Sequence, residues 1–453
     1  MHEYCTRLRG SKRIEFIKLN LERGYLPLNI KEALVEMKAQ SPVLGATPVE
    51  KRNEALSYII EELKADSAKI FKANEKDLEE AHKANLADAI IQRLKFNEKK
   101  LEGLVAGLAD LIKLPDPLFK TTLARQLDEG LNMYRRTCPI GVIGIIFEAR
   151  PDALVQISSL CIKSGNCAVL KGGSETFNTN RVLFQSIQKA LVRAGISEYV
   201  LFQAEERTEI SELLKYDEYV DLIIPRGSNA FVRYIMDNTK IPVLGHADGK
   251  CHIYVDTSAD FEKALKVIVD SKTQYVSVCN AVEALLVNRA IAKEFLPLLA
   301  KTLADNNVTV KGNKEVSDYI SCDVVEDAEL VKEYLDYIVS VRIVEDEAEA
   351  IQYINKNGSH HTDCIIAEDK EAVAQFMRLV DSAGVYNNCS TRFADGYRYG
   401  FGAEVGVSTV KIHARGPVGL EGMVTYKYEI YGNGHIVDDY ASGKKEFHFK
   451  ELE

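Results

Sequence analysis

The spacing of apolar residues changes part-way along the chain. From Val49 to about Ile112, apolar residues recur at helical spacing with many Glu and Lys between them, which predicts several amphipathic helices in series. After Pro139, short apolar runs alternate with helical stretches instead. Strands that alternate with helices form parallel sheets joined by βαβ crossovers, so we expect an α/β protein.

The apolar runs after residue 139 fall into two series. The first has strands expected at 141–147, 167–171, 200–202, 222–224 and 241–244, with helices at 154–163 and 180–193. The second begins with a strand at 252–256 and continues with strands near 284–288, 308–311, 340–344 and 364–367 and helices near 260–270 and 289–305. Two such series predict two α/β units.

Other segments lie outside these series. Residues 127–136 predict a hairpin that turns at Asp128-Glu129-Gly130, and residues 426–436 predict a second exposed hairpin that turns at Gly432-Asn433-Gly434. Near the start, Ile30 to Ala39 predicts a helix that Ser41-Pro42 is expected to end. We interpret residues 1–45 as an appended segment.

Charge and cysteine usage narrow the class of protein. The chain has 453 residues and a formal net charge of -10, which argues against binding to nucleic acid or to an anionic membrane surface. No apolar run is long enough to span a bilayer, and the first residues lack the pattern of a signal peptide. Nine cysteines without zinc-ligand spacing indicate free thiols, so we expect a cytoplasmic enzyme without a metal.

One cysteine stands where a nucleophile is expected. Cys279 lies in the stretch 275–283, at the mouth of a polar loop, and the apolar run 284–287 that follows predicts a buried strand. A thiolate held between a loop and a rigid strand can attack an acyl carbon. The alternative for a free cysteine is a small buried hydrophobe.

Two loops follow strands at the edge where open α/β sheets bind ligands. In Lys171-Gly172-Gly173-Ser174-Glu175, the lysine can neutralise phosphate, the glycines permit close backbone approach, and the serine or glutamate can bond a ribose hydroxyl. In Pro225-Arg226-Gly227-Ser228-Asn229, the arginine and the N–H groups of a helix start can hold a pyrophosphate. Neither fits GxGxxG or a P-loop, and ordinary βα turns are the alternative, but two such loops in one sheet favour a nucleotide site.

A third segment suits a substrate loop. The run 384–393 and the residues 401–404 are polar, glycine-rich and aromatic at once. In this segment we expect Asn387 and Arg392 to contact the substrate, since arginine binds a carboxylate or phosphate with two hydrogen bonds. A surface ion pair is the alternative for Arg392. The histidines at 360, 361 and 413 have no partner with metal-ligand spacing.

These segments together resemble the gamma-glutamyl phosphate reductase family, a branch of the aldehyde dehydrogenase superfamily that acts in proline synthesis. The resemblance covers roughly residues 46 to 436. It is carried by the runs 138–175, 222–234, 241–256, 277–287, 360–369 and 385–421, of which the last is the most specific. It implies a Rossmann-like dinucleotide-binding domain at 46–126 and 139–255, an α/β catalytic domain at 256–424, and an oligomerisation arm and tail at 127–138 and 425–453.

The resemblance also implies a cofactor and residue roles. The family cofactor is NADPH, and by match Lys171, Ser174 and the Arg226-Gly227 loop contact it. Cys279 matches the family nucleophile and would form a thioester with L-glutamyl 5-phosphate. We expect backbone N–H groups near Cys279, with the Asn280 side chain, to stabilise the oxyanion.

One departure from the wider superfamily supports the narrower assignment. Hydrolytic members carry a glutamate general base where this chain has His246, in the run His246-Ala247-Asp248-Gly249-Lys250. A reductase of an acyl phosphate should not activate water, because water would destroy its thioester. We therefore place His246 beside the substrate and expect phosphate to be the acyl acceptor in the reverse direction.

Two other functions remain open on the same scaffold. A coenzyme A-acylating dehydrogenase would share Cys279 and the missing glutamate, although the run 385–393 argues against it. A non-enzymatic nucleotide-binding protein would tolerate loss of Cys279, Lys171 and Arg226, all of which are present. For partners, we expect a homo-oligomer, a dimer or tetramer, with functional coupling to a glutamate 5-kinase.

Overall fold

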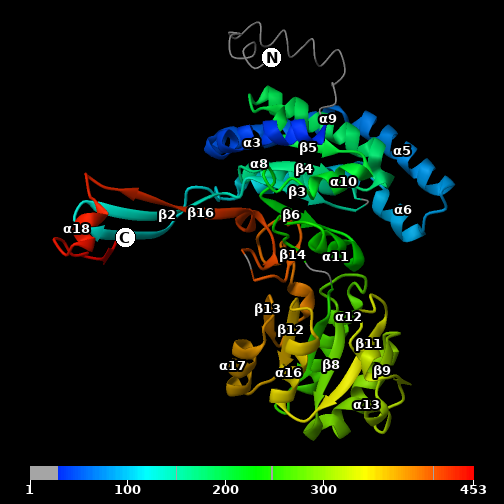
Figure 1. The fold of residues 1–453 in the computed structure, drawn as a ribbon. Helices are drawn as coiled ribbons and strands as arrows, with labels where there is room; N and C mark the ends of the chain where they lie inside the picture. The colour runs from blue at the N-terminus through cyan, green and yellow to red at the C-terminus, as the bar shows by residue number, and fades with distance from the viewer. Residues whose placement is uncertain (1–28, 149, 246–247, 412, 453) are drawn as a thin grey trace.

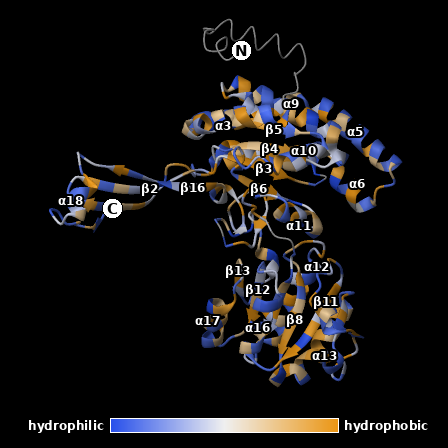
Figure 2. Cartoon of the chain, viewed as in Figure 1, coloured by the Kyte–Doolittle hydropathy of each residue, from blue (hydrophilic) through white to orange (hydrophobic). Residues whose placement is uncertain are grey.

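The molecule has three parts, which Figure 1 shows in one view. The structure, a computed structural model, describes residues 29–148, 150–245, 248–411 and 413–452. Two α/β units lie one above the other, and an arm of antiparallel strands extends sideways with the C-terminus near its end. Apolar residues concentrate along the strands of both parallel sheets (Figure 2). Within the described ranges, no helix has the length and apolar character needed to cross a bilayer.

The first unit is built on a four-stranded parallel sheet in the order β5-β4-β3-β6. Its strands are β3 (Val142–Ile146), β4 (Cys167–Lys171), β5 (Leu201–Ala204) and β6 (Leu222–Pro225), which confirms four of the five expected strands. Its helices are α3 (Ile30–Ala46), α4 (Val49–Ala65), α5 (Ser67–Lys83), α6 (Asp88–Leu94), α7 (Glu98–Lys113), α8 (Pro151–Lys163), α9 (Phe177–Arg193), α10 (Arg207–Leu213) and α11 (Asn229–Asp237). All residues of β3, β4 and β6 are buried, as parallel strands covered on both faces should be.

The fifth expected strand, at 241–244, forms only an isolated bridge. Val243 pairs with Ile223, and the bridge consists of two hydrogen bonds, from the Ile223 N–H to the Pro242 carbonyl and from the Leu244 N–H to the Ile223 carbonyl. Pro242 has no N–H to donate, so the pairing cannot extend into a regular ladder.

The helix near the start is longer than expected and belongs to the first unit. It continues through Pro42 to Ala46, and its buried side chains, Leu34 and Leu44 among them, join the core of the first sheet. Lys38 Nζ also lies 2.6 Å from Asp221 Oδ1, beside β6. A proline inside a helix removes one backbone hydrogen bond, and the apolar burial on both sides of Pro42 offsets that loss. Residues 30–45 are therefore not an appended segment.

The second unit contains a seven-stranded parallel sheet in the order β10-β9-β11-β8-β7-β12-β13. Its strands are β7 (Cys251–Val255), β8 (Val282–Asn288), β9 (Thr309–Gly312), β10 (Asp323–Val324), β11 (Ile338–Val344), β12 (Thr362–Ile366) and β13 (Gly384–Asn387). Its helices are α12 (Phe261–Thr273), α13 (Arg289–Asp305), α14 (Lys314–Ser317), α15 (Asp327–Leu330), α16 (Glu347–Asn357) and α17 (Lys370–Leu379). In β7, Ile253 and Tyr254 enter different apolar clusters, because successive side chains point to opposite faces.

The arm is a four-stranded antiparallel sheet in the order β16-β2-β1-β17. Its first two strands, β1 (Thr121–Asp128) and β2 (Leu131–Pro139), form the expected hairpin at Gly130, which has a φ of 73°. The expected second hairpin is wrong. β16 (Val424–Tyr431) pairs along its whole length with β2, and the chain then passes through α18 (Val437–Ala441) to β17 (Lys450–Glu451) on β1. Alternation indicates a strand but does not identify its partner.

The chain returns to the first unit before it enters the arm. Val405, Val418, Leu420 and Met423 are buried in the core of the first sheet, around the short strands β14 (Val407–Ser408) and β15 (Gly416–Pro417). Residues 405–423 thus pack with the first unit, although they follow the second in sequence.

Candidate active site

Cys279 lies at the amino-terminal edge of the second sheet. It precedes β8, in which every residue is buried, and a turn closed by the Ala281 N–H and the Val278 carbonyl (3.0 Å) leads into that strand. Its side chain is only partly buried. The rigid strand thus holds a thiol that solvent and small molecules can reach.

A histidine contacts this thiol. His361 Nε2 is 3.2 Å from Cys279 Sγ, and His361 Nδ1 is 2.9 Å from Thr362 Oγ1. The ring is fully buried at the start of β12. An imidazole at this distance can accept the thiol proton, which is the arrangement of a base beside a cysteine nucleophile.

Sequence reasoning considered His361 only as a metal ligand and missed this contact. The available signal was its place directly before an apolar strand, as for Cys279. Parallel strands begin at the same edge of a sheet, and β8, β7 and β12 are neighbours. Among the described residues, no group of three His, Cys, Asp or Glu side chains is placed to hold a metal ion.

Gly249 fixes the backbone of the cysteine loop. A Cβ at Gly249 would lie 2.4 Å from Cys279 Cα and 2.5 Å from its carbonyl oxygen. Both atoms belong to backbone that no rotamer change can move aside. Glycine is therefore required for this close approach.

The other described thiols are expected to be weaker nucleophiles than Cys279. Burial raises the pKa of seven further cysteines: Cys138, Cys161, Cys167, Cys251, Cys322, Cys364 and Cys389. The shift is large for Cys251, which lies behind the site with its Sγ 3.8 Å from His361 Nδ1. A thiol that stays protonated is a poor nucleophile.

The structure also places Asn280 and Arg392 close to the cysteine loop. Asn280 Nδ2 donates to the Ala394 carbonyl at 2.8 Å, and the main-chain carbonyl of Asn280 accepts from Thr391 Oγ1 at 2.7 Å, so this residue joins two loops. Arg392 is 7% exposed and its Nε donates to Gln274 Oε1 at 2.9 Å. Burial and Arg398 lower the pKa of Arg392, while Asp395 and Cys279 oppose them.

Asn387 is not brought to this site. It ends β13, and its amide donates to the carbonyls of Ile365 (3.3 Å) and Ala367 (3.2 Å), at the end of β12 opposite to His361. The expected substrate contact is therefore corrected: the run 384–393 passes along the sheet before Arg392 approaches Cys279. His246 lies outside the described residues.

The two glycine-containing loops both lie at the carboxyl edge of the first sheet, because they follow β4 and β6. Lys171 Nζ donates to the Gly172 carbonyl at 2.7 Å, and a Cβ at Gly172 would lie 2.4 Å from Asn180 Nδ2. Ser174, at the start of the short helix η1 (Ser174–Thr176), is exposed, and Glu175 is partly so.

The second loop ends at the start of α11. Ser228 is the N-cap residue of α11, but its side chain makes no capping hydrogen bond, and a Cβ at Gly227 would lie 3.0 Å from Phe231 Cδ1. The loops offer a lysine, exposed hydroxyls, a helix start and two glycines without room for a side chain. This donor set fits the phosphates and ribose of a dinucleotide.

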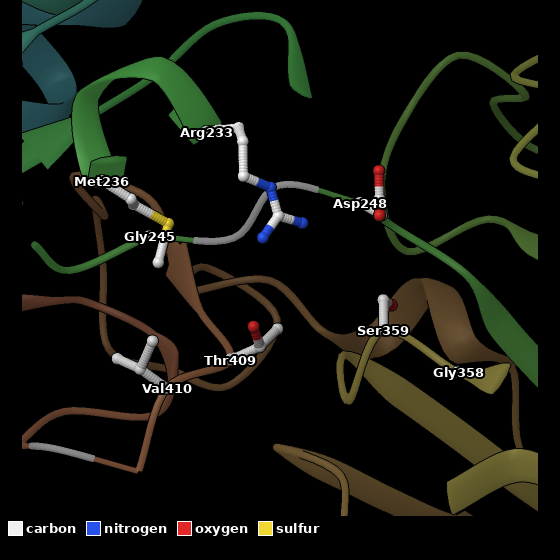
Figure 3. Close-up of a pocket in the computed structure, with 8 residues that line it drawn as sticks. All are labelled: Arg233, Met236, Gly245, Asp248, Gly358, Ser359, Thr409 and Val410. Carbon is white, nitrogen blue, oxygen red and sulfur yellow. The ribbon is translucent and has the colours of Figure 1, made fainter. Parts of the chain in front are cut away.

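The carboxyl edge of the first sheet faces the amino edge of the second (Figure 1). Between the units, a cavity of about 240 Å³ is lined by residues of α11, by Gly245 and Asp248, and by residues 358–359 and 409–410. Figure 3 shows Arg233 of α11 directed into this space, with Asp248 and Ser359 across from it. The two edges thus form opposite walls of one interdomain cleft.

Comparison with known proteins agrees with this arrangement. The sequence model of the Aldehyde dehydrogenase family matches residues 27–319, a range that includes α3. Gamma-glutamyl phosphate reductase of Ruminiclostridium cellulolyticum is 54% identical over 425 residues, which are 94% of this chain and 98% of that protein. The chain belongs to the gamma-glutamyl phosphate reductase family of the aldehyde dehydrogenases.

Further gamma-glutamyl phosphate reductases support this membership. That of Acetivibrio thermocellus is 53% identical over 94% of this chain and 99% of its own length. The crystal structure of gamma-glutamyl phosphate reductase from Thermotoga maritima superimposes with a TM-score of 0.88 at 36% identity, covering 90% of this chain and 100% of that one. The aldehyde dehydrogenases bind a nicotinamide dinucleotide, and the two loops of the first unit are the part of this family member that suits one.

Proposed function

We propose that the chain reduces L-glutamyl 5-phosphate to L-glutamate 5-semialdehyde and phosphate with NADPH, the second step of proline synthesis from glutamate. The observation that carries the proposal is the contact between Cys279 Sγ and His361 Nε2 at 3.2 Å, in a chain of the gamma-glutamyl phosphate reductase family. A partly exposed thiol beside an imidazole is suited to acyl transfer.

The chemistry at the thiol follows from this contact. His361 accepts the proton of Cys279, and the thiolate attacks the acyl carbon of the substrate. The new S–C bond forms as the C–O bond to phosphate breaks, and the electron pair leaves with the phosphate. The product of this step is a thioester on Cys279. Later the sulfur leaves as a thiolate again, and His361 is placed to return a proton.

The oxyanion that forms during attack needs donors close to Cys279. The backbone N–H groups of Cys279 and Asn280 lie in the loop before β8, next to the reacting sulfur. The Asn280 amide is already bonded to the Ala394 carbonyl, so its contribution is to hold the loop in place. Arg392, buried on the same unit, binds the α-carboxylate of the substrate in this proposal.

The cofactor is held at the carboxyl edge of the first sheet. Lys171, with Ser174 or Glu175, would bind the ribose and its phosphate, and the loop through Gly227 and Ser228 would bind the pyrophosphate at the start of α11. The chemistry that a reduced nicotinamide would supply there is hydride for the thioester carbon. A lysine beside exposed hydroxyl groups suits the additional phosphate of NADPH. In the cell, we place the enzyme in the cytoplasm, as a homo-oligomer coupled to the kinase that makes its substrate.

The proposal is tested in the reverse direction. NADPH formation is followed by absorbance with NADP and pyrroline-5-carboxylate, the cyclised form of the semialdehyde, with and without inorganic phosphate. A rate that requires phosphate is expected, because phosphate must take the acyl group from Cys279. The variant Cys279→Ala should lose turnover and still bind NADPH. A rate independent of phosphate would mean that water accepts the acyl group, and the proposal would fail.

A further inference from the structure

One arginine at the carboxyl edge of the first sheet has no side-chain partner among the described residues. Arg150 pairs with Asp152 at 2.9 Å, and Arg398 lies 3.6 Å from Asp395. Arg226 is half-buried at the end of β6, yet no described residue forms a hydrogen bond or ion pair with its guanidinium. A half-buried cation without a partner is costly, because desolvation is not repaid by pairing. Such a group marks a place for an anion.

The position of Arg226 is well defined. Its N–H donates to the Ile146 carbonyl at 2.6 Å, at the carboxyl ends of β3 and β6. Its side chain runs toward the segment that returns from the second unit: a Cβ at Gly406 would lie 3.9 Å from Arg226 Cδ and Nε. The side chain therefore lies at the carboxyl edge of the first sheet, against residues that return to the first unit.

Charged groups of both units influence the Arg226 guanidinium. Burial lowers the pKa of Arg226, Glu404 opposes that change, Arg150 adds to it, and the charge of Cys279 also reaches the group. The Glu404 carboxylate is itself engaged, since its Oε2 accepts from the Gly396 N–H at 2.8 Å.

The proposed substrate has an anion at each end, a carboxylate and a phosphate. Arg392 lies beside the cysteine loop on the second unit, since its neighbour Thr391 donates to the Asn280 carbonyl. Arg226 lies on the first unit, at the carboxyl edge of the sheet that borders the cavity between the units. A dinucleotide pyrophosphate does not need Arg226, because Gly227, Ser228 and the start of α11 follow it in the loop. The backbone N–H groups of this loop are thus assigned to the pyrophosphate of the cofactor, and the Arg226 side chain is left for a different anion.

We propose that the Arg226 guanidinium binds the phosphoryl group of the acyl phosphate and carries the phosphate as it leaves. This inference rests on the proposed function. Two parallel N–H donors match a phosphate, and they neutralise the charge that grows on the bridging oxygen when the C–O bond breaks. The electron pair of that bond goes to phosphate, and the proton of Cys279 goes to His361. In the reverse direction, Arg226 binds the inorganic phosphate that attacks the thioester.

The experiment compares Arg226→Gln, Arg226→Lys and the wild type. For each, the KM for phosphate is measured in the reverse assay and the Kd for NADPH by fluorescence titration. Losing one charge-assisted pair should raise the KM for phosphate roughly 10- to 100-fold in Arg226→Gln, and Arg226→Lys should fall between. The Kd for NADPH should change less than about twofold, which also reports that the variants are folded. Arg378→Gln, which removes the same charge from exposed α17, should match the wild type in both.

Two outcomes would overturn the inference. A raised Kd for NADPH with an unchanged KM for phosphate would assign Arg226 to the cofactor. An unchanged KM for phosphate in both variants, with NADPH still bound, would leave the phosphate to another group. A wild-type rate without phosphate dependence is a different failure, since it removes the proposed function itself. If Arg226→Gln does not fold, Arg226→Lys decides the question by the same two constants.

Discussion

His361 Nε2 lies 3.2 Å from Cys279 Sγ, although 82 residues separate the two in sequence. The imidazole is buried, and its Nδ1 is 2.9 Å from Thr362 Oγ1. This second contact fixes the orientation of the ring. The thiol is partly open to the cleft. The pair therefore presents a sulfur to substrate while keeping the base away from bulk water.

Replacing His361 by Asn should slow acyl transfer. Removing a general base typically costs roughly 10²- to 10⁴-fold in rate, and we expect kcat to fall in that range. Alkylation of Cys279 by iodoacetamide at neutral pH should slow in parallel, because fewer thiolates form. The matched control is His360→Asn: His360 has a φ of 58°, which Asn tolerates, and its ring contacts the Asp381 carbonyl instead of the thiol. Equal activity in the two variants would contradict the role of His361.

Replacing Gly249 by Ala should lower turnover, because it displaces the backbone of Cys279 although the cysteine itself is unchanged. The new Cβ would overlap Cys279 Cα, so the loop must shift, and a displacement near 1 Å costs roughly 100-fold in rate. NADPH affinity should stay close to that of the wild type. The control is Gly103→Ala on α7, where a Cβ meets nothing within 4 Å. That variant should be fully active and slightly more stable, since Ala favours a helix over Gly. Wild-type turnover in Gly249→Ala would show that the loop absorbs the methyl group.

Low pH should reduce the folding stability of the first unit, because it protonates the Asp66 carboxylate. Burial alone would raise the pKa of this carboxyl, but hydrogen bonds from Lys189, Lys69 and Ser186 outweigh it and hold the pKa at about 2. The usual pKa is 3.8, so the folded state binds fewer protons than the unfolded state. The stability gained from this carboxylate is complete above about pH 4 and is lost as the pH falls toward 2.

The variant Asp66→Asn tests this assignment. Its free energy of unfolding should be lower at neutral pH by on the order of 1 to 2 kcal/mol, and should fall less between pH 4 and pH 2 than that of the wild type. Chemical denaturation at several pH values provides the measurement. Asp110→Asn serves as the control because Asp110 pairs only with exposed Lys113. Parallel pH curves for wild type and Asp66→Asn would contradict the assignment.

The arm should mediate self-association. Tyr426, Tyr428 and Ile430 occupy one face of β16 and are 53%, 54% and 57% exposed. β16 is also an edge strand of its sheet, and such edges with apolar faces pair with other chains. Ile430→Glu should therefore reduce the mass measured by light scattering after gel filtration. Lys444→Glu, an equally exposed change near the end of the arm, should leave that mass unchanged.

The sequence was informative wherever a local pattern determines structure. Cys279 could be recognised because a polar loop ends directly at the apolar run of β8, and the loops after β4 and β6 could be found in the same way. Contacts between segments that are distant in sequence could not be predicted in this way. The strand order β8-β7-β12 brings His361 to the thiol, and no periodicity encodes that order.

Two of the corrections, those for Asn387 and for the helix through Pro42, have the same origin. Asn387 was expected at the substrate, but β13 carries it to the far end of the sheet, and the sequence does not say which end of a segment faces the site. The helix through Pro42 was cut short because a proline is locally unfavourable, whereas Leu44 beyond it gains burial against the first sheet. In both cases, tertiary packing outweighs the local signal.

Because the described thiols differ in burial, they should differ in reactivity, and Cys279 should be labelled selectively. Burial raises the pKa of the seven other described cysteines. In a Cys5→Ser chain, which lacks the cysteine outside the described residues, a mild electrophile at neutral pH should therefore consume one equivalent per competent molecule, at Cys279. The stoichiometry of that reaction then reports the fraction of molecules in a preparation that are able to turn over. A fluorescent or isotopic tag could then be placed at the reaction centre without replacing any of the seven other described cysteines.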